Sequence, residues 1–117
     1  RLLWELPAGT LEKNEDPAAA APRELEEETG YRAGRVERIA SFYTTPGMTD
    51  ELMHAFLAVD LREVGQRLEE DEEIEPRVVT VDEALSMIDR AELVDAKSML
   101  ALLLADRRGL LRPGRRG

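Results

Sequence analysis

Residues 52–59, LMHAFLAV, form an apolar run of strand length in which His54 is the only polar side chain. A strand there would place Leu52, His54, Phe56 and Ala58 on one face and Met53, Ala55, Leu57 and Val59 on the other. Residues 36–43, VERIASFY, are rich in β-branched and aromatic residues and predict a second strand. The segment between them, TTPGMTDE, contains a Pro-Gly pair of the kind that makes turns. The pattern therefore predicts two strands joined by a turn, and for an isolated Pro-Gly pair a hairpin loop is the simplest interpretation.

Other apolar runs predict elements before and after this pair of strands. The run RLLWELP at residues 1–7 ends at a proline and predicts a strand. Residues 61–68 are compatible with a short helix, and residues 77–80 with the last strand. These segments would supply the remaining parts of one sheet.

Two helices are predicted in the C-terminal part of the chain. Thr80 and Glu83 have the spacing of a capping box, and Asp95 is a suitable N-cap for a later helix that Gly109 would end. The expected segments are helices at 82–90 and 95–108 and a flexible basic tail at 109–117. The apolar face of the last helix is expected in the core or in a dimer contact and consists of Leu100, Leu103 and Leu104.

A helix is also predicted for residues 17–29. Asp16 can cap it, Pro17 suits the first helical position, and Gly30 can end it in the left-handed conformation. Pro22 lies inside this segment and removes one backbone donor. We therefore expect a kink, or a looser first turn and a helix that settles only from Pro22 onward.

Three glutamates crowd the end of this helix. Glu24, Glu27 and Glu28 are three or four residues apart and project from one side. Each like-charge pair costs about 0.2–0.5 kcal/mol, and the C-terminal end of a helix disfavours anions. The simplest interpretation is a solvated acidic face tempered by Arg23, Arg32 and Lys13. A bound cation would explain the same crowding.

At these positions the sequence resembles the Nudix hydrolase family. The family signature is G-x5-E-x7-R-E-U-x-E-E-x-G-U, where U is a bulky apolar or aromatic residue. Nine residues fill every fixed position, namely Gly9, Glu15, Arg23, Glu24, Leu25, Glu27, Glu28, Gly30 and Tyr31. The resemblance implies an α+β fold, the Nudix α/β/α sandwich with a mixed sheet, in which the usual N-terminal strands are missing before Arg1.

The resemblance also implies a metal site that uses Mg²⁺, with Mn²⁺ as a possible substitute. Mg²⁺ prefers carboxylate and carbonyl oxygens and bridges to substrate phosphate. The implied metal ligands are Glu24, Glu28, the Ala8 carbonyl and Glu27, the last either directly or through water. Structural roles fall on Glu15, Arg23 and Gly30. Arg23 would hold a glutamate, with Glu15 as a plausible partner, or would form only a surface ion pair with Glu27.

Beyond the signature, the sequence is similar to the ADP-ribose pyrophosphatase branch of the family. Pro46 lies fifteen residues after Tyr31, at the offset where that branch has S-P-G-x-x-x-E, although Thr45 replaces the serine. The implied substrate-binding residues are Gly9, Pro46, Gly47, Met48 and Glu51. The acidic run EEDEEIE at residues 69–75 is commonly just solvated, but in this branch such a loop supplies the residue that activates the attacking water or binds a further metal. The implied catalytic residues are Glu72 first, Glu70 second, and Glu27.

Composition restricts the partners that the protein can have. The 117 residues carry a formal net charge of −9, which argues against nonspecific binding to nucleic acids or membranes. The chain has no cysteine, which excludes disulfides and thiolate metal sites and is compatible with a cytoplasmic protein. We expect a single Nudix domain over residues 1–117, N-terminally incomplete, and a homodimer.

The expected function is Mg²⁺-dependent hydrolysis of the pyrophosphate bond of a nucleoside diphosphate derivative, with ADP-ribose giving AMP and ribose 5-phosphate. Two alternatives stay open. One is a pyrophosphatase for another nucleotide sugar or dinucleotide. The other is a Nudix domain that binds a nucleotide or regulates a partner without catalysis.

Overall fold

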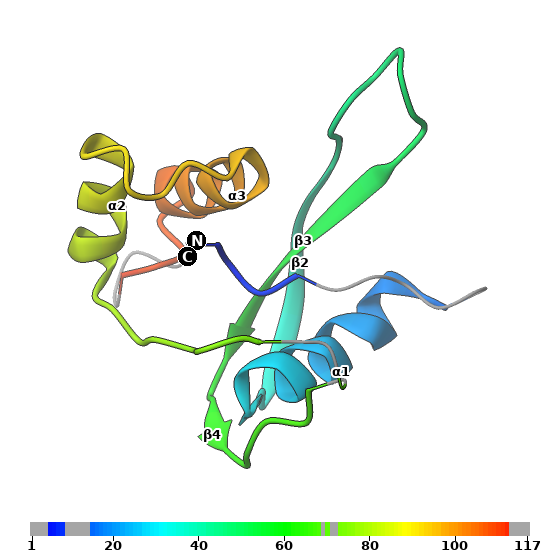
Figure 1. Cartoon of the computed structure of the whole chain (residues 1–117), viewed down its shortest axis with the longest axis vertical. Helices are drawn as coiled ribbons and strands as arrows, with labels where there is room; N and C mark the ends of the chain where they lie inside the picture. Colours follow the sequence, from blue (N-terminus) through cyan, green and yellow to red (C-terminus); the bar gives the residue numbers. More distant parts are fainter. Residues whose placement is uncertain (1–4, 9–14, 69, 71–72, 113–117) are drawn as a thin grey trace. The chain divides into compact units, whose positions relative to one another are not determined.

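The computed structural model describes residues 5–8, 15–68, 70 and 73–112. Within these residues the chain forms two compact units (Figure 1). One unit spans Pro7–Pro76, and the other combines Arg1–Leu6 with Arg77–Gly117. The elements of the first unit are α1 (Pro17–Thr29), β1 (Tyr31–Arg32), β2 (Arg35–Tyr43), β3 (Leu52–Val59) and β4 (Arg62–Glu63).

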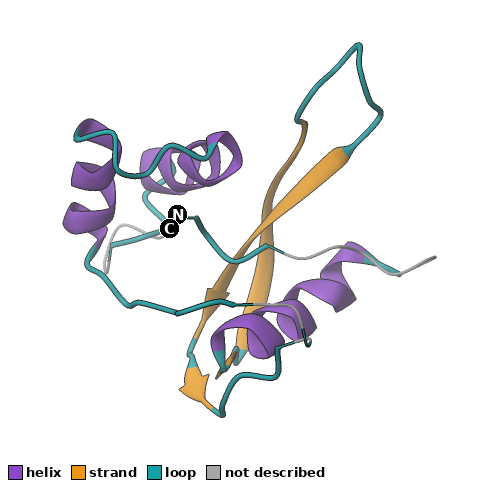
Figure 2. Ribbon diagram, viewed as in Figure 1, coloured by secondary structure: helices purple, strands orange, loops and turns teal. Residues whose placement is uncertain are grey.

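The predicted hairpin is confirmed. β2 and β3 pair in antiparallel register from Arg35 opposite Val59 to Tyr43 opposite Leu52. A register shift between Arg38 and Ala40 marks a bulge in β2. Figure 2 shows these two strands as a long twisted ribbon whose turn projects beyond the rest of the unit.

A second pair of strands, β1 and β4, lies next to the end of α1. Strand β4 falls within residues 61–68, for which a helix was predicted. Tyr31 of β1 pairs with Glu63 of β4 in antiparallel register, so both pairs of strands in the described residues are antiparallel. The helix predicted for residues 61–68 is wrong. Gly65 has φ +98°, which a right-handed helix cannot accommodate, and the amide of Val64 donates to the Gly30 carbonyl at 2.7 Å instead of to a helical partner.

Helix α1 has the predicted ends. The Asp16 carboxylate accepts from the Ala18 amide, and Gly30 takes the left-handed conformation with φ 79°. The alternative in which the helix settles only from Pro22 onward is wrong, because the helix already begins at Pro17. Both Ala19 and Ala20 donate to the Asp16 carbonyl at 3.0 Å, so the first turn forms without the missing donor of Pro22.

The second unit contains α2 (Val81–Asp89) and α3 (Ala96–Arg107). The amide of Glu83 donates to the Thr80 hydroxyl at 3.0 Å, and the amide of Ser98 donates to the Asp95 carboxylate at 3.0 Å, so both predicted N-caps are confirmed. Gly109 follows α3 with φ 69° and ends it as expected. The buried core of this unit is formed by Met87, Leu93 and Leu102.

The core alternative for the predicted apolar face of the last helix is wrong for Leu100 and Leu103, and the dimer contact stays a prediction. Leu100 and Leu103 are 45% and 48% exposed, whereas Leu102 and Ala105 are buried. The reason is Ser98, whose hydroxyl binds the Asp95 carboxylate at 2.7 Å and accepts from the Leu6 amide at 2.8 Å. These bonds turn the face that carries Ser98 inward, and Leu102 and Ala105 share that face at spacings of four and seven residues.

Two predicted strands are absent from the described residues. Residues 77–80 form no strand, and Val78 is 81% exposed, because no neighbouring strand within the described residues pairs with this segment. Residues 5–8 form no strand either, and residues 1–4 lie outside the described residues. No helix in the described part of the chain is long and apolar enough to cross a membrane.

Candidate active site

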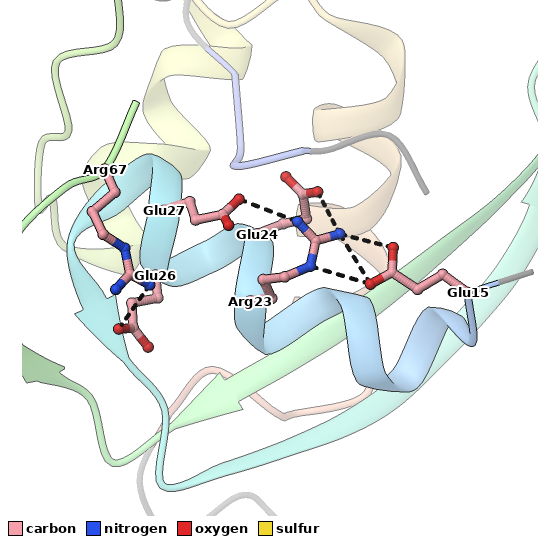
Figure 3. Close-up of polar contacts among 6 residues, drawn as sticks. All are labelled: Glu15, Arg23, Glu24, Glu26, Glu27 and Arg67. Carbon is pink, nitrogen blue, oxygen red and sulfur yellow. Dashed lines mark hydrogen bonds and ion pairs between the residues drawn. The ribbon is translucent and has the colours of Figure 1, made fainter. Parts of the chain in front are cut away.

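The acidic side of α1 is organised around Arg23 (Figure 3). Nη2 of Arg23 donates to Glu15 Oε1 at 2.7 Å, and Nε donates to Glu15 Oε2 at 3.1 Å. Two parallel bonds of this kind fix both the direction and the distance of the carboxylate, which a lysine could not do. The predicted tether between Arg23 and Glu15 is therefore present.

Arg23 also contacts two of the glutamates predicted as metal ligands. Its Nη2 lies 3.0 Å from Glu24 Oε1, and its Nη1 lies 3.2 Å from Glu27 Oε2. Arg23 thus forms both the predicted tether to Glu15 and the predicted ion pair with Glu27, one helical turn further along. Among these contacts, one guanidinium faces three carboxylates.

Glu28 differs from the other glutamates of this group because it is buried, at 7% exposure. Its backbone carbonyl accepts from the Gln66 side-chain amide at 2.6 Å. Burial of a carboxylate is costly unless hydrogen bonds or cations compensate. Glu28 is therefore held in place by the surrounding unit, whereas Glu24 and Glu27 lie nearer the solvent.

Glu26 belongs to a separate ion-pair group that sequence analysis did not find. Its Oε1 lies 3.0 Å from Arg32 Nη2 and 3.3 Å from Arg67 Nη2. The hydrogen bond from Arg32 is the main reason why the pKa of Glu26 is lowered. Arg67 is 41 residues away in sequence, so no helical spacing indicates this contact.

The donor chemistry of the Arg23 cluster fits a hard divalent cation. Each of Glu24 and Glu27 uses one oxygen for its ion pair with Arg23, and a carboxylate offers about four lone-pair sites over two oxygens. The described residues contain no group of three or more His, Cys, Asp or Glu side chains already arranged to hold a metal. A cation would thus bind through the second oxygen of each carboxylate or through lone pairs that the ion pair with Arg23 leaves available.

The predicted substrate loop is exposed and bonded to itself. The hydroxyl of Thr44 donates to Glu51 Oε1 at 2.6 Å, and the hydroxyls of Thr45 and Thr49 lie 2.6 Å apart. Met48 is 86% exposed, and Pro46 and Gly47 are exposed as well. Figure 1 shows this loop at the tip of the hairpin, away from α1. The structure therefore does not bring the loop and the glutamates of α1 together.

The remaining predicted site residues fall at the limits of the described chain. Ala8 is exposed and lies outside any helix or strand, and Glu70 is exposed in a turn. Gly9 and Glu72 lie outside the described residues. Their roles stay predictions.

Comparison with known proteins assigns the family. The family model of the NUDIX domain matches residues 1–102, which is most of the chain. The chain belongs to the Nudix family. The fold is similar to that in a crystal structure of an ADP compounds hydrolase, which superposes with a TM-score of 0.70 at 26% identity. That superposition covers 83% of this chain and 52% of the other.

Two curated relatives are similar over most of the chain. An ADP-ribose pyrophosphatase of Bacillus subtilis (strain 168) is 47% identical over 104 residues, which cover 87% of this chain and 56% of the relative. A methanol dehydrogenase activator of Bacillus methanolicus is 45% identical over 100 residues, which cover 84% of this chain and 54% of the relative. The chain thus spans about half the length of these relatives.

Proposed function

We propose that the protein hydrolyses the pyrophosphate bond of a nucleoside diphosphate derivative with the help of Mg²⁺, and that ADP-ribose is the substrate. The observation that carries the proposal is the cluster around Arg23, which holds carboxylates of the Nudix signature on one helix. The similarity to an ADP-ribose pyrophosphatase supports this choice of substrate.

In this proposal Glu24, Glu28 and the Ala8 carbonyl hold the metal, and Glu27 contributes directly or through water. A divalent ion bound there would lower the pKa of a water molecule and stabilise the charge that develops on phosphate. Arg23 keeps the signature glutamates in one orientation, because its fork binds Glu15 while the same guanidinium contacts Glu24 and Glu27.

The reaction consumes one water molecule. Its oxygen forms a bond to phosphorus as the bond between phosphorus and the bridging oxygen breaks, so ADP-ribose and water give AMP and ribose 5-phosphate. A carboxylate accepts the proton of the attacking water, and we assign this role to Glu72 or, second, to Glu70. Gly9, Pro46, Gly47, Met48 and Glu51 would contact the substrate.

A second candidate function has an observation of its own. The relative that is 45% identical is named for activating a dehydrogenase. The chain could therefore belong to a regulatory protein whose Nudix domain acts on a partner enzyme. Intact signature glutamates favour hydrolysis, since a pure regulator has no need of a cluster with excess carboxylates.

The test is release of AMP from ADP-ribose in the presence of Mg²⁺. We expect turnover with the wild type and a loss of at least about 100-fold in Glu28→Gln, which removes a proposed ligand while keeping its shape. Glu26→Gln is the matched control, because the same change on the same helix lies in the separate group with Arg32 and Arg67. No turnover with a panel of nucleotide sugars and dinucleotides would contradict the hydrolase.

Two further expectations accompany this proposal. We propose a homodimer, which sedimentation of the purified protein would test. We also propose a cytoplasmic location, which fractionation of cells would test.

A further inference from the structure

The C-terminal turn of α1 is closed by a segment that follows β4, residues 64–67. The last carbonyls of a helix have no partners within the helix. Here the Arg67 amide donates to the Glu27 carbonyl at 2.8 Å, and the Gln66 side chain donates to the Glu28 carbonyl at 2.6 Å. The carbonyls of two proposed metal-binding residues are therefore held by neighbouring residues of one distant segment.

The contact between this segment and the helix end is too close for a side chain. A Cβ placed on Gly30 would lie 2.9 Å from the backbone nitrogen of Gln66 and 2.9 Å from the backbone carbonyl carbon of Gly65. The Gly30 carbonyl in turn accepts from Val64 at 2.7 Å and from Gly65 at 3.1 Å. Backbone packs directly on backbone here, so a displacement of the segment would displace the helix end.

Gln66 joins three parts of the chain through one amide group. Its Nε2 donates to the Glu28 carbonyl and also to the Ile74 carbonyl at 2.9 Å. An amide nitrogen has two hydrogens, so both donors are in use. Gln66 thus connects the turn that carries Glu27 and Glu28 with Ile74, which lies inside the acidic run of residues 69–75.

We propose that Gln66 is a positioning residue that sets the orientation of Glu28 toward the divalent metal. This inference rests on the proposed function. Gln66 touches neither metal nor substrate and acts through the backbone of Glu28. A buried glutamate has little freedom beyond that of its backbone, so fixing this carbonyl fixes where the carboxylate points. Residues that support metal ligands typically contribute 10–100-fold to metal affinity.

The primary test measures Mn²⁺ affinity by calorimetry, without substrate. In Gln66→Met, which keeps the length but has no amide donors, we expect affinity to fall by about 10–100-fold. In Gln66→Asn, which is one methylene shorter and cannot reach both carbonyls, we expect an intermediate loss. The second variant makes a milder change, so it reports on the role even where the first is poorly folded.

Arg67→Ala is the matched control for these variants. It removes the neighbouring side chain, which contacts only Glu26 among the contacts described above, but keeps the backbone amide that donates to Glu27. We expect its Mn²⁺ affinity to stay within about twofold of the wild type. A loss equal to that of Gln66→Met would overturn the inference, because the effect would then belong to the whole segment.

Kinetics with ADP-ribose separate positioning from general support of the fold. We expect kcat to fall in the Gln66 variants while KM changes little, because the proposed substrate contacts lie elsewhere. A lower melting temperature with unchanged Mn²⁺ affinity and kcat would assign Gln66 a structural role only and overturn the inference. A wild type that neither binds Mn²⁺ nor hydrolyses any nucleoside diphosphate would instead refute the proposed function, and the inference with it.

Discussion

Two ion-pair groups on α1 use the same residue types in opposite proportions. Around Arg23, one cation faces the three carboxylates of Glu15, Glu24 and Glu27. Around Glu26, one carboxylate faces Arg32 and Arg67. Counting these side chains alone, the first group has a charge of 1 − 3 = −2 and the second 2 − 1 = +1.

The difference indicates which group can accept another cation. The Glu26 group is already satisfied by its arginines, and its members gain nothing from a divalent ion. In the contacts described above, the Arg23 group has more carboxylates than cations, and in the proposed function a divalent ion would bind among these carboxylates. The same helix thus carries one group suited to holding the fold and one suited to binding a ligand.

Replacing Arg23 should have the largest effect on this comparison. In Arg23→Met the three carboxylates lose their common partner, and we expect turnover of ADP-ribose to fall by about 10–100-fold. Because repulsion between the carboxylates is then unscreened, added Mn²⁺ should raise the melting temperature more in the variant than in the wild type. Equal Mn²⁺ effects in both proteins would show that the excess charge does not act on the metal.

An effect of intermediate size, on stability, is expected when Asp95 is replaced. Its carboxylate accepts mainly from neutral donors, the amide and the hydroxyl of Ser98. The Ser98 hydroxyl is the main reason why the pKa of Asp95 is lowered. Asp95→Ala should cost about 1 kcal/mol of unfolding free energy at pH 7, as for other N-caps. A lowered pKa gives stability that is complete above the unfolded pKa of about 3.9 and is lost as pH falls through the folded value.

The difference between wild type and Asp95→Ala should therefore shrink in urea unfolding experiments below about pH 4. Asp16→Ala is the control, since the Asp16 carboxylate accepts at a longer 3.4 Å and should contribute less to its helix. A difference that stays constant down to pH 2 would contradict the role of the ionised cap.

The smallest effect is expected for Glu26→Gln. Its ion pairs lie at the surface, where such pairs contribute little, so turnover should stay within about twofold. Because Arg32 lowers the pKa of Glu26 in the folded protein, the ion pairs stabilise the fold at pH values above the pKa of Glu26 in the unfolded chain. This stabilisation disappears as pH falls through the pKa of Glu26 in the folded state. Melting curves of both proteins should thus converge at acid pH. A large loss of activity would abolish the distinction between the two groups.

The sequence predicts those parts of the fold that local chemistry determines. Asp16, Gly30 and Asp95 specify helix ends through their immediate neighbours, and an apolar run of strand length specifies β3. The tether of Arg23 to Glu15 also follows from the signature, because the two residues lie eight apart around the start of one helix.

Predictions fail where a residue far away in the sequence determines the local structure. Residues 61–68 have helical composition, but Val64 and Gly65 bind the Gly30 carbonyl and leave only the short strand β4. The inward face of α3 is selected by a bond between Ser98 and Leu6, which lie 92 residues apart. The contacts of Glu26 with Arg67 and of Gln66 with Glu28 belong to the same class, and no periodicity in the sequence indicates them.

The absence of space for a Cβ at Gly30 has a consequence for protein engineering. The last glycine of the signature is demanded both by its own backbone angle and by Gly65 and Gln66, which lie outside the signature. Transplanting only the twenty-three signature residues into another scaffold would therefore leave the end of the helix without the backbone segment that packs against it. A functional graft has to carry the strand and the four residues that close this end, residues 62–67, together with the motif.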